Sequence, residues 1–151
     1  MSDAKTPSNP SRRATARVKN PLPVPTICNI CGEEAVRESS HMEIYGRVYS
    51  DWPYNYLCEC CGAYVGMHPF TNIPLGTLAD KELRELRKIS KYFFNQIWQE
   101  ECLLSRSDAY AELAKRMGIS VEQCHFGWFN KEQCYKAREV CEAYLAEHYW
   151  D

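Results

Sequence analysis

Two cysteine pairs constrain the fold of this 151-residue chain more than any other feature. They read Cys28-Asn29-Ile30-Cys31-Gly32 and Cys58-Glu59-Cys60-Cys61-Gly62. Cysteines three residues apart can direct both sulfurs at one metal ion from a tight turn, and the following glycine lets the backbone fold beneath the ion without a Cβ clash. Two such pairs supply the four sulfurs of a closed tetrahedral zinc shell.

The spacing therefore predicts a structural Zn²⁺ held by Cys28, Cys31, Cys58 and Cys61. A closed shell leaves no position for water or substrate, so the pattern indicates a structural metal and not a catalytic one. The alternative is a set of unligated cysteines in a reduced core. Cys58 and Cys61 have the C-x-x-C spacing, whereas Cys58 and Cys60 do not. Cys60 is therefore interpreted as a spare thiol, which could also exchange with a ligand or help to bind a softer metal.

Cysteine usage and charge indicate the setting of the chain. It has nine cysteines, an odd number, and no apolar run follows the first five residues. These features favour a reducing, cytoplasmic location over a disulfide scaffold. No stretch is long enough to span a membrane, so no membrane association is expected. The net charge of −2 gives no overall sign of a nucleic-acid-binding protein.

Composition divides the chain into three parts and predicts an α+β protein. Residues 1–26 are expected to form a disordered basic tail, in which Lys5, Arg12, Arg13, Arg17 and Lys19 oppose only Asp3. Residues 27–76 are expected to form a zinc ribbon of antiparallel hairpins, and residues 77–151 a helical unit of three to four helices packed on the ribbon. The rings between the cysteine pairs are expected mainly to shield the metal.

Local patterns predict the elements within these parts. Strand-like composition covers residues 35–38, 43–49, 54–58 and 63–67. The capping box Thr77-Leu78-Ala79-Asp80 predicts the start of a helix. The apolar stripe of that helix comprises Leu83, Leu86, Ile89, Phe93 and Ile97. A second helix should begin at Ser105 or Ser107 and end at Gly118, a short turn should follow Ser120, and Asn130 should cap a last helix that runs towards Tyr149.

Two sets of basic residues are candidates for a nucleic-acid-binding surface. Lys81, Arg84, Lys88 and Lys91 form a second stripe on the first long helix, and Arg12 and Arg13 belong to the tail. Rows of cations can follow a phosphate backbone. The alternative is a solvated helix face whose counter-charge comes from Glu82 and Glu85.

Three further interpretations of the sequence concern His68, residues 113–120 and the remaining cysteines. His68, with His41 and Asp51 before it, could act as a general base in a metal-dependent nuclease, or could cap the loop before Pro69. Residues 113–120 resemble the turn of a helix-turn-helix, although the aromatic segment 124–129 suits packing better than base readout. A second metal site is the remaining alternative, from Cys124, His125, Cys134 and Cys141.

The cysteine motifs and several short strings resemble a zinc-finger-containing family of tailed phages and prophages. The strings include Tyr45-Gly46-Arg47-x-Tyr49, Gly62-Ala63-Tyr64-Val65-Gly66, His68-Pro69, Pro74-Leu75-Gly76-Thr77-Leu78-Ala79-Asp80, Arg106-Ser107-Asp108-Ala109-Tyr110, Met117-Gly118-Ile119 and Cys124-His125-Phe126-Gly127-x-Phe129. The resemblance runs from Cys28 to about Cys141. It implies the same four zinc ligands and a phage setting, and it implies little about activity.

Together these patterns predict a non-catalytic zinc-binding module. Its expected partner is nucleic acid or a nucleic-acid-processing complex in a phage-infected cell. The first alternative is an inhibitor or adaptor that binds a host protein, and the second is the nuclease that depends on His68.

Overall fold

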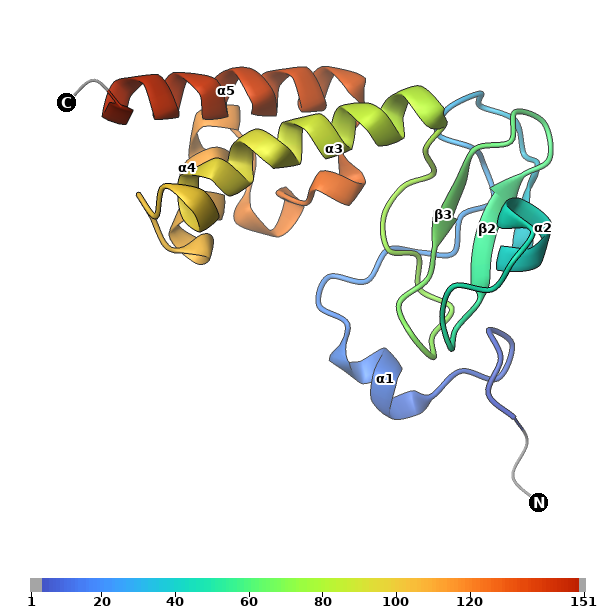
Figure 1. Cartoon of the computed structure of the whole chain (residues 1–151). Helices are drawn as coiled ribbons and strands as arrows, with labels where there is room; N and C mark the ends of the chain where they lie inside the picture. Colours follow the sequence, from blue (N-terminus) through green and yellow to red (C-terminus); the bar gives the residue numbers. More distant parts are fainter. Residues whose placement is uncertain (1–3, 150–151) are drawn as a thin grey trace. The chain divides into compact units, whose positions relative to one another are not determined.

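The computed structural model describes residues 4–149 and divides the chain into two compact units, Met1–Asp80 and Lys81–Asp151 (Figure 1). The first unit holds a small sheet and the second is helical, so the predicted α+β class is confirmed. Residues 1–3 of the predicted tail and residues 150–151 of the predicted helical unit lie outside the described part.

The first unit contains a three-stranded antiparallel sheet in the order β1-β2-β3. The strands are β1 (Val36–Ser40), β2 (Tyr54–Cys58) and β3 (Tyr64–Gly66). Val36 lies opposite Cys58, and Leu57 lies opposite Tyr64. β2 therefore ends at Cys58, the first cysteine of the second pair, and the turn that follows carries Cys61.

A helix replaces one of the predicted strands. Residues 43–49 were expected to be extended, and this prediction was wrong, because α2 (His41–Tyr45) occupies the start of the segment. The Ser40 side chain accepts a hydrogen bond from the Glu43 backbone N–H at 3.2 Å, and Gly46 ends the helix with φ of 76°. Ser40 and Glu43 have the spacing of a capping box, which outweighs the strand-like composition of the segment.

The N-terminal segment also differs from the expected irregular tail. It contains a short helix, α1 (Arg12–Arg17), whose first turn is capped by the Ser11 side chain. The Ser11 backbone N–H donates to the Phe70 carbonyl at 2.8 Å. Ala14, Thr15 and Val18 are half-buried, whereas Arg12, Arg13 and Arg17 are exposed. A weak apolar face and one backbone bond therefore attach this basic segment to the first unit.

The first long helix begins later than its predicted capping box. α3 spans Lys81–Asn95, because the residues before it bond to the first unit. Ala79 exchanges two backbone hydrogen bonds with Tyr64, at 3.0 and 3.2 Å, and the Leu78 N–H donates to the Asn29 side chain at 2.9 Å. These contacts hold residues 78–79 in an extended conformation, and the helix starts only beyond them.

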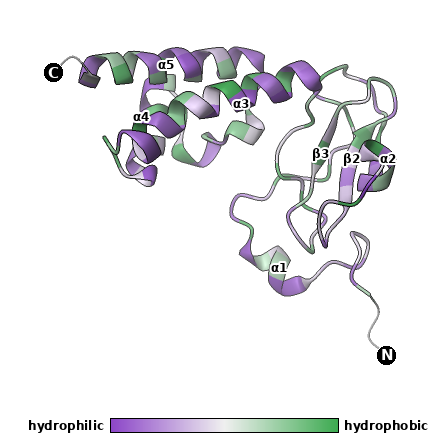
Figure 2. Ribbon diagram, viewed as in Figure 1, coloured by the Kyte–Doolittle hydropathy of each residue, from purple (hydrophilic) through white to green (hydrophobic). Residues whose placement is uncertain are grey.

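The second unit consists of three long helices and three short helical turns. The π-helical turn η1 (Gln96–Glu100) extends α3, and α4 (Arg106–Met117) follows. Two 3₁₀ turns, η2 (Val121–Gln123) and η3 (Phe126–Trp128), precede α5 (Lys131–Tyr149). α5 packs against α3 and α4, and both hydrophilic and hydrophobic residues occur along each long helix (Figure 2). Among residues 4–149, no helix has both the length and the apolar character needed to cross a membrane.

The buried face of α3 is rotated from the predicted stripe. Leu83 and Ile97 are buried as expected, but Ile89 is 39% exposed while Ser90 and Phe94 are buried. Ser90 tolerates burial because its hydroxyl donates to the carbonyl groups of the preceding turn. Phe94 instead joins an aromatic core with Tyr110 and Phe126, at centroid distances of 4.4 and 5.3 Å.

The predicted start and end of α4 and the predicted cap of α5 are confirmed. Ser105 caps α4 and Gly118 closes it with φ of 74°. Asn130 and Gln133 exchange backbone-to-side-chain hydrogen bonds of 2.8 and 2.9 Å at the start of α5. The helix-turn-helix interpretation requires a recognition helix after Gly118. The described chain instead forms the two 3₁₀ turns η2 and η3 between Gly118 and α5, and Phe126 in the second turn is buried.

Candidate metal centre

The two cysteine turns have the same backbone geometry. In the first, the Gly32 N–H donates to the Cys28 carbonyl at 2.9 Å, and the Cys28 N–H donates to the Glu33 carbonyl at 2.9 Å. In the second, the corresponding bonds from Gly62 and Cys58 measure 2.9 and 2.8 Å. Each turn closes with a glycine in the left-handed region, with φ of 80° and 81°. The C-x-x-C-Gly pattern therefore specifies each turn locally.

The structure brings the four predicted cysteines together. The sulfurs of Cys28 and Cys61 are 3.6 Å apart, as are those of Cys31 and Cys58, and all four lie within 4.8 Å of one another. A tetrahedral zinc ion with bonds of about 2.3 Å separates its sulfurs by about 3.8 Å. The donor set and its spacing therefore fit Zn²⁺.

Burial and hydrogen bonding differ among the four thiols. Cys28 and Cys58 are buried, whereas Cys31 and Cys61 are exposed. Burial raises the pKa of Cys28, while hydrogen bonds from the backbone of Cys61 and Cys60 lower the pKa of Cys58 to about 7. Backbone N–H groups that point at a sulfur stabilise the thiolate, which is the form that binds metal.

A short segment from the end of the first unit covers the centre. Leu78 is buried in a cluster with Cys28, Cys58 and Ala63. Asn29, in the first cysteine turn, donates from its amide nitrogen to the Leu78 carbonyl at 2.8 Å and accepts from the Leu78 N–H at 2.9 Å. This two-bond pairing holds the apolar cover on the sulfurs. Sequence patterns did not predict a role for Asn29.

Cys60 lies outside the cluster. Its side chain is exposed, and the group of sulfurs that share one centre comprises Cys28, Cys31, Cys58 and Cys61. Within residues 4–149, that group is the one set of three or more potential ligands close enough to hold an ion. The alternative site from Cys124, His125, Cys134 and Cys141 is therefore not assembled. Its three cysteines are buried in the second unit, and burial raises the pKa of Cys124 to about 11 and that of Cys141 to about 12.

Comparison with known proteins agrees with the geometry. A family model described as a zinc-finger-containing domain matches residues 24–144. The chain belongs to this family, DUF3268. No curated protein and no solved structure matches it significantly. The family model and the four-cysteine cluster together confirm the predicted structural zinc of this zinc-finger-containing domain.

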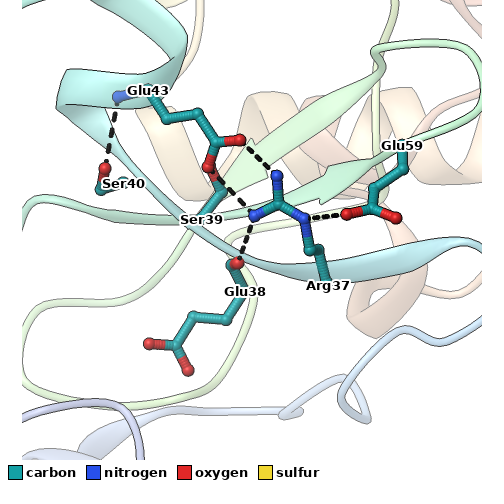
Figure 3. A network of polar contacts seen from close by, with 6 residues as sticks. All are labelled: Arg37, Glu38, Ser39, Ser40, Glu43 and Glu59. Atoms are coloured by element: carbon teal, nitrogen blue, oxygen red, sulfur yellow. Dashed lines mark hydrogen bonds and ion pairs between the residues drawn. The ribbon is translucent and has the colours of Figure 1, made fainter.

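An ion-pair network links the second cysteine turn of the zinc-finger-containing domain to α2 (Figure 3). Arg37 on β1 contacts Glu59, next to Cys58, and Glu43 on α2. Ser39 also donates to Glu43, at 2.7 Å. Hydrogen bonds from Arg37, and then from Ser39, lower the pKa of Glu43 to about 2, so this carboxylate is ionised at neutral pH.

The predicted basic residues occupy two separate elements. Lys81, Lys88 and Lys91 are exposed on α3 and Arg84 is half-buried there, while Arg12 and Arg13 are exposed on α1. Of the two expected counter-charges, Glu82 pairs with Lys131 of α5 at 2.8 Å, and Glu85 lies 4.0 Å from Lys88. The carboxylate of Glu82 therefore forms its ion pair with a lysine of α5.

His68 lies apart from the four sulfurs, beside α1. Its imidazole is half-buried and lines a groove with Arg17 and Lys19. Burial lowers the pKa of His68, which favours the neutral ring at pH 7. The hydrogen bonds that hold its loop use the backbone groups of His68: its N–H donates to the Ile73 carbonyl at 2.9 Å, and its carbonyl accepts from the Thr71 hydroxyl at 2.8 Å.

Proposed function

We propose that this protein is a non-catalytic zinc-binding module that binds nucleic acid, or a complex that processes it, in the cytoplasm of a phage-infected cell. The observation that supports this proposal most is the basic row of α3, which comprises Lys81, Arg84, Lys88 and Lys91. Its three lysines are exposed, and Glu82 on the same helix pairs with α5. Glu85 supplies a counter-charge 4.0 Å from Lys88, and a row of four cations along one helix suits a phosphate backbone.

The first unit supplies a second basic segment. Arg12 and Arg13 lie on the exposed side of α1, and α1 bonds to the folded unit through Ser11. A cationic segment that is attached to a folded unit loses less conformational entropy on binding than a free tail. The zinc centre has a structural role in this proposal: four thiolates of Cys28, Cys31, Cys58 and Cys61 would close its shell and hold the turns on which the first unit is built.

Fluorescence anisotropy with labelled single- and double-stranded oligonucleotides, over a series of salt concentrations, tests the proposal. The double variant Lys88→Gln/Lys91→Gln should bind a duplex more weakly and lower the slope of log K against log salt by about 1.8, since each lost phosphate contact removes about 0.9. Lys115→Gln/Lys136→Gln is the matched control, because it removes the same charge from exposed positions elsewhere in the second unit. If the wild type binds no nucleic acid even at low salt, direct nucleic-acid binding is rejected and a protein partner is favoured.

One observation favours the alternative of an adaptor or inhibitor that binds a host protein. Met42, Tyr45, Val48 and Tyr49 are all exposed, on α2 and the loop that follows it. The expectation that the rings mainly shield the metal does not account for this apolar surface, and exposed apolar groups of this kind are typical of protein contacts. A pull-down from host lysate, with Met42→Ser/Tyr49→Ser as the paired bait, tests it. A host protein retained by the wild type and lost by the variant would support this second function.

A further inference from the structure

A groove runs between α1 and the loop at residues 68–70 of the first unit. It has a volume of about 440 Å³ and is lined by Arg17, Lys19, His68 and Phe70, with Ala14 and Val18 at its α1 side. A volume of this order accommodates a small organic ligand such as a nucleotide. The zinc centre, the α3 row and the α2 surface do not contribute residues to it.

Both walls of the groove are held in place by named contacts. On the α1 side, the Ser11 N–H donates to the Phe70 carbonyl at 2.8 Å, and the Ser11 hydroxyl accepts from the Ala14 N–H at 3.2 Å. On the loop side, the fully buried Thr71 accepts a bond from the Trp52 indole at 3.0 Å. The side chains that face the groove are therefore attached to an ordered frame before any ligand arrives.

Phe70 has an unusual backbone conformation for its residue type. Its φ is +64°, in the left-handed region that is rarely occupied by residues other than glycine, asparagine and aspartate. Its ring contacts the Trp52 ring, with centroids 5.1 Å apart, and Phe70 as a whole residue is 42% exposed. Strain of this kind persists where the surrounding structure imposes it, and such residues cluster at ligand sites.

The chemistry of the groove is cationic and aromatic. Arg17 and Lys19 are basic side chains, His68 offers ring nitrogens for hydrogen bonding, and Phe70 offers an aromatic ring on an exposed residue. None of the described residues that line the groove is a carboxylate. This combination matches an anion joined to a flat ring, which describes a phosphate with its nucleobase. In a duplex both faces of each base are covered by neighbouring pairs, so only an unpaired base can stack on a side chain.

We propose that this groove holds one nucleotide of a single-stranded nucleic acid, with its phosphate on Arg17 and Lys19 and its base on the ring of Phe70. The inference rests on the proposed nucleic-acid function and narrows it to single strands in the first unit. His68, in this arrangement, lies beside the phosphate and offers a ring nitrogen for hydrogen bonding.

Phe70→Gly provides the sharpest test. Glycine removes the ring and adopts φ of +64° without strain, so the variant should keep its fold, which circular dichroism and a zinc assay would verify. Affinity for a labelled oligothymidylate should fall about 5- to 160-fold, the range for one base stacked on an aromatic ring. Phe70→Tyr keeps the ring and should bind as the wild type does.

The cationic side of the groove has its own test. Arg17→Gln/Lys19→Gln should weaken single-strand binding and lower the salt slope by about 1.4, because each phosphate contact on a single strand contributes about 0.7. Lys115→Gln/Lys136→Gln again serves as the charge-matched control. Wild-type protein should also prefer the single strand to a duplex of equal length, and thymidine monophosphate alone should shift the NMR signal of the Phe70 amide.

The outcomes separate this inference from the function on which it rests. If the wild type binds oligothymidylate and both groove variants bind it equally well, the groove assignment is wrong while nucleic-acid binding stands. If the wild type prefers a duplex and the groove variants bind the duplex as tightly as the wild type does, the groove assignment is also wrong and nucleic-acid binding stands. If it binds no nucleic acid at low salt, the groove assignment and direct nucleic-acid binding are both overturned.

Discussion

At the scale of single residues, the pairing of Asn29 with Leu78 has the clearest measurable consequence. Asn29→Ala removes two hydrogen bonds that hold the apolar cover over the sulfurs. Each bond contributes about 1 kcal/mol, so the free energy of unfolding should fall by about 1–3 kcal/mol. Denaturant titration of the zinc-loaded protein measures this change, and zinc transfer to a chelator should become faster.

The matched control is Asn29→Asp. It keeps an oxygen that accepts from the Leu78 N–H and loses the amide that donates to the Leu78 carbonyl, so its stability should lie between those of the wild type and the alanine variant. An alanine variant as stable as the wild type would mean that Leu78 stays over the sulfurs without this pairing.

The same residues show which parts of the site could be predicted. Each cysteine turn closes its hydrogen bonds within six consecutive residues, so the pattern C-x-x-C-Gly contains the information for that turn. The Asn29–Leu78 pairing joins positions 49 residues apart. No local pattern marks such a contact, because it depends on how the chain returns to the first turn. The placement of His68 beside Arg17 and Lys19 was hidden for the same reason.

At the scale of elements, α2 shows how a short capping signal can outweigh composition. Ser40→Ala removes the acceptor for the Glu43 N–H and should destabilise this five-residue helix by about 0.5–2 kcal/mol. Amide hydrogen exchange should accelerate at residues 42–45, while α5 in the other unit should be unaffected. Ser40→Asp keeps an oxygen at the capping position and should preserve wild-type exchange. Unchanged exchange in Ser40→Ala would show that the contacts of Arg37 and Ser39 with Glu43 hold α2 without the cap.

The boundaries of α4 and the start of α5 were predictable, whereas the start of α3 and its buried face were not. Ser105, Gly118 and Asn130 mark their boundaries through bonds to neighbouring residues, and all three act as predicted. The buried face of α3 depends instead on what packs against it. A polar residue, Ser90, takes an inward position because its hydroxyl bonds within its own helix, and the apolar Ile89 turns outward. Hydrophobicity alone could not distinguish these two neighbours.

At the scale of the whole molecule, zinc should stabilise the two units unequally. The first unit has a three-stranded sheet of short strands and two small buried clusters, so its fold should depend on the metal. The second unit has its own aromatic core. A chelator should therefore abolish the dispersed amide NMR signals of residues 26–80 and leave the helical circular dichroism of the second unit largely intact. Loss of both units together would show that they unfold as one.

Thiol variants connect that result to the four proposed ligands. Cys31→Ser should abolish stoichiometric zinc binding, whereas Cys60→Ser should leave the metal content at one ion per chain, since Cys60 lies outside the cluster. Zinc retained by Cys31→Ser and lost by Cys60→Ser would reassign the ligand. The separation of a part that holds the four cysteines from a helical part follows from the cysteine spacing and the helix signals, which can be read without the structure.

The alternation of buried and exposed sulfurs gives the centre an inner and an outer half. Cys28 and Cys58 face the interior, and Cys31 and Cys61 face solvent. An oxidant or a metal-binding protein that competes for the zinc would reach the sulfurs of Cys31 and Cys61 first. The ion would then lose these two ligands before the two buried ones. Exchange of the metal with its surroundings would then begin without prior global unfolding, at a rate governed by two surface thiolates.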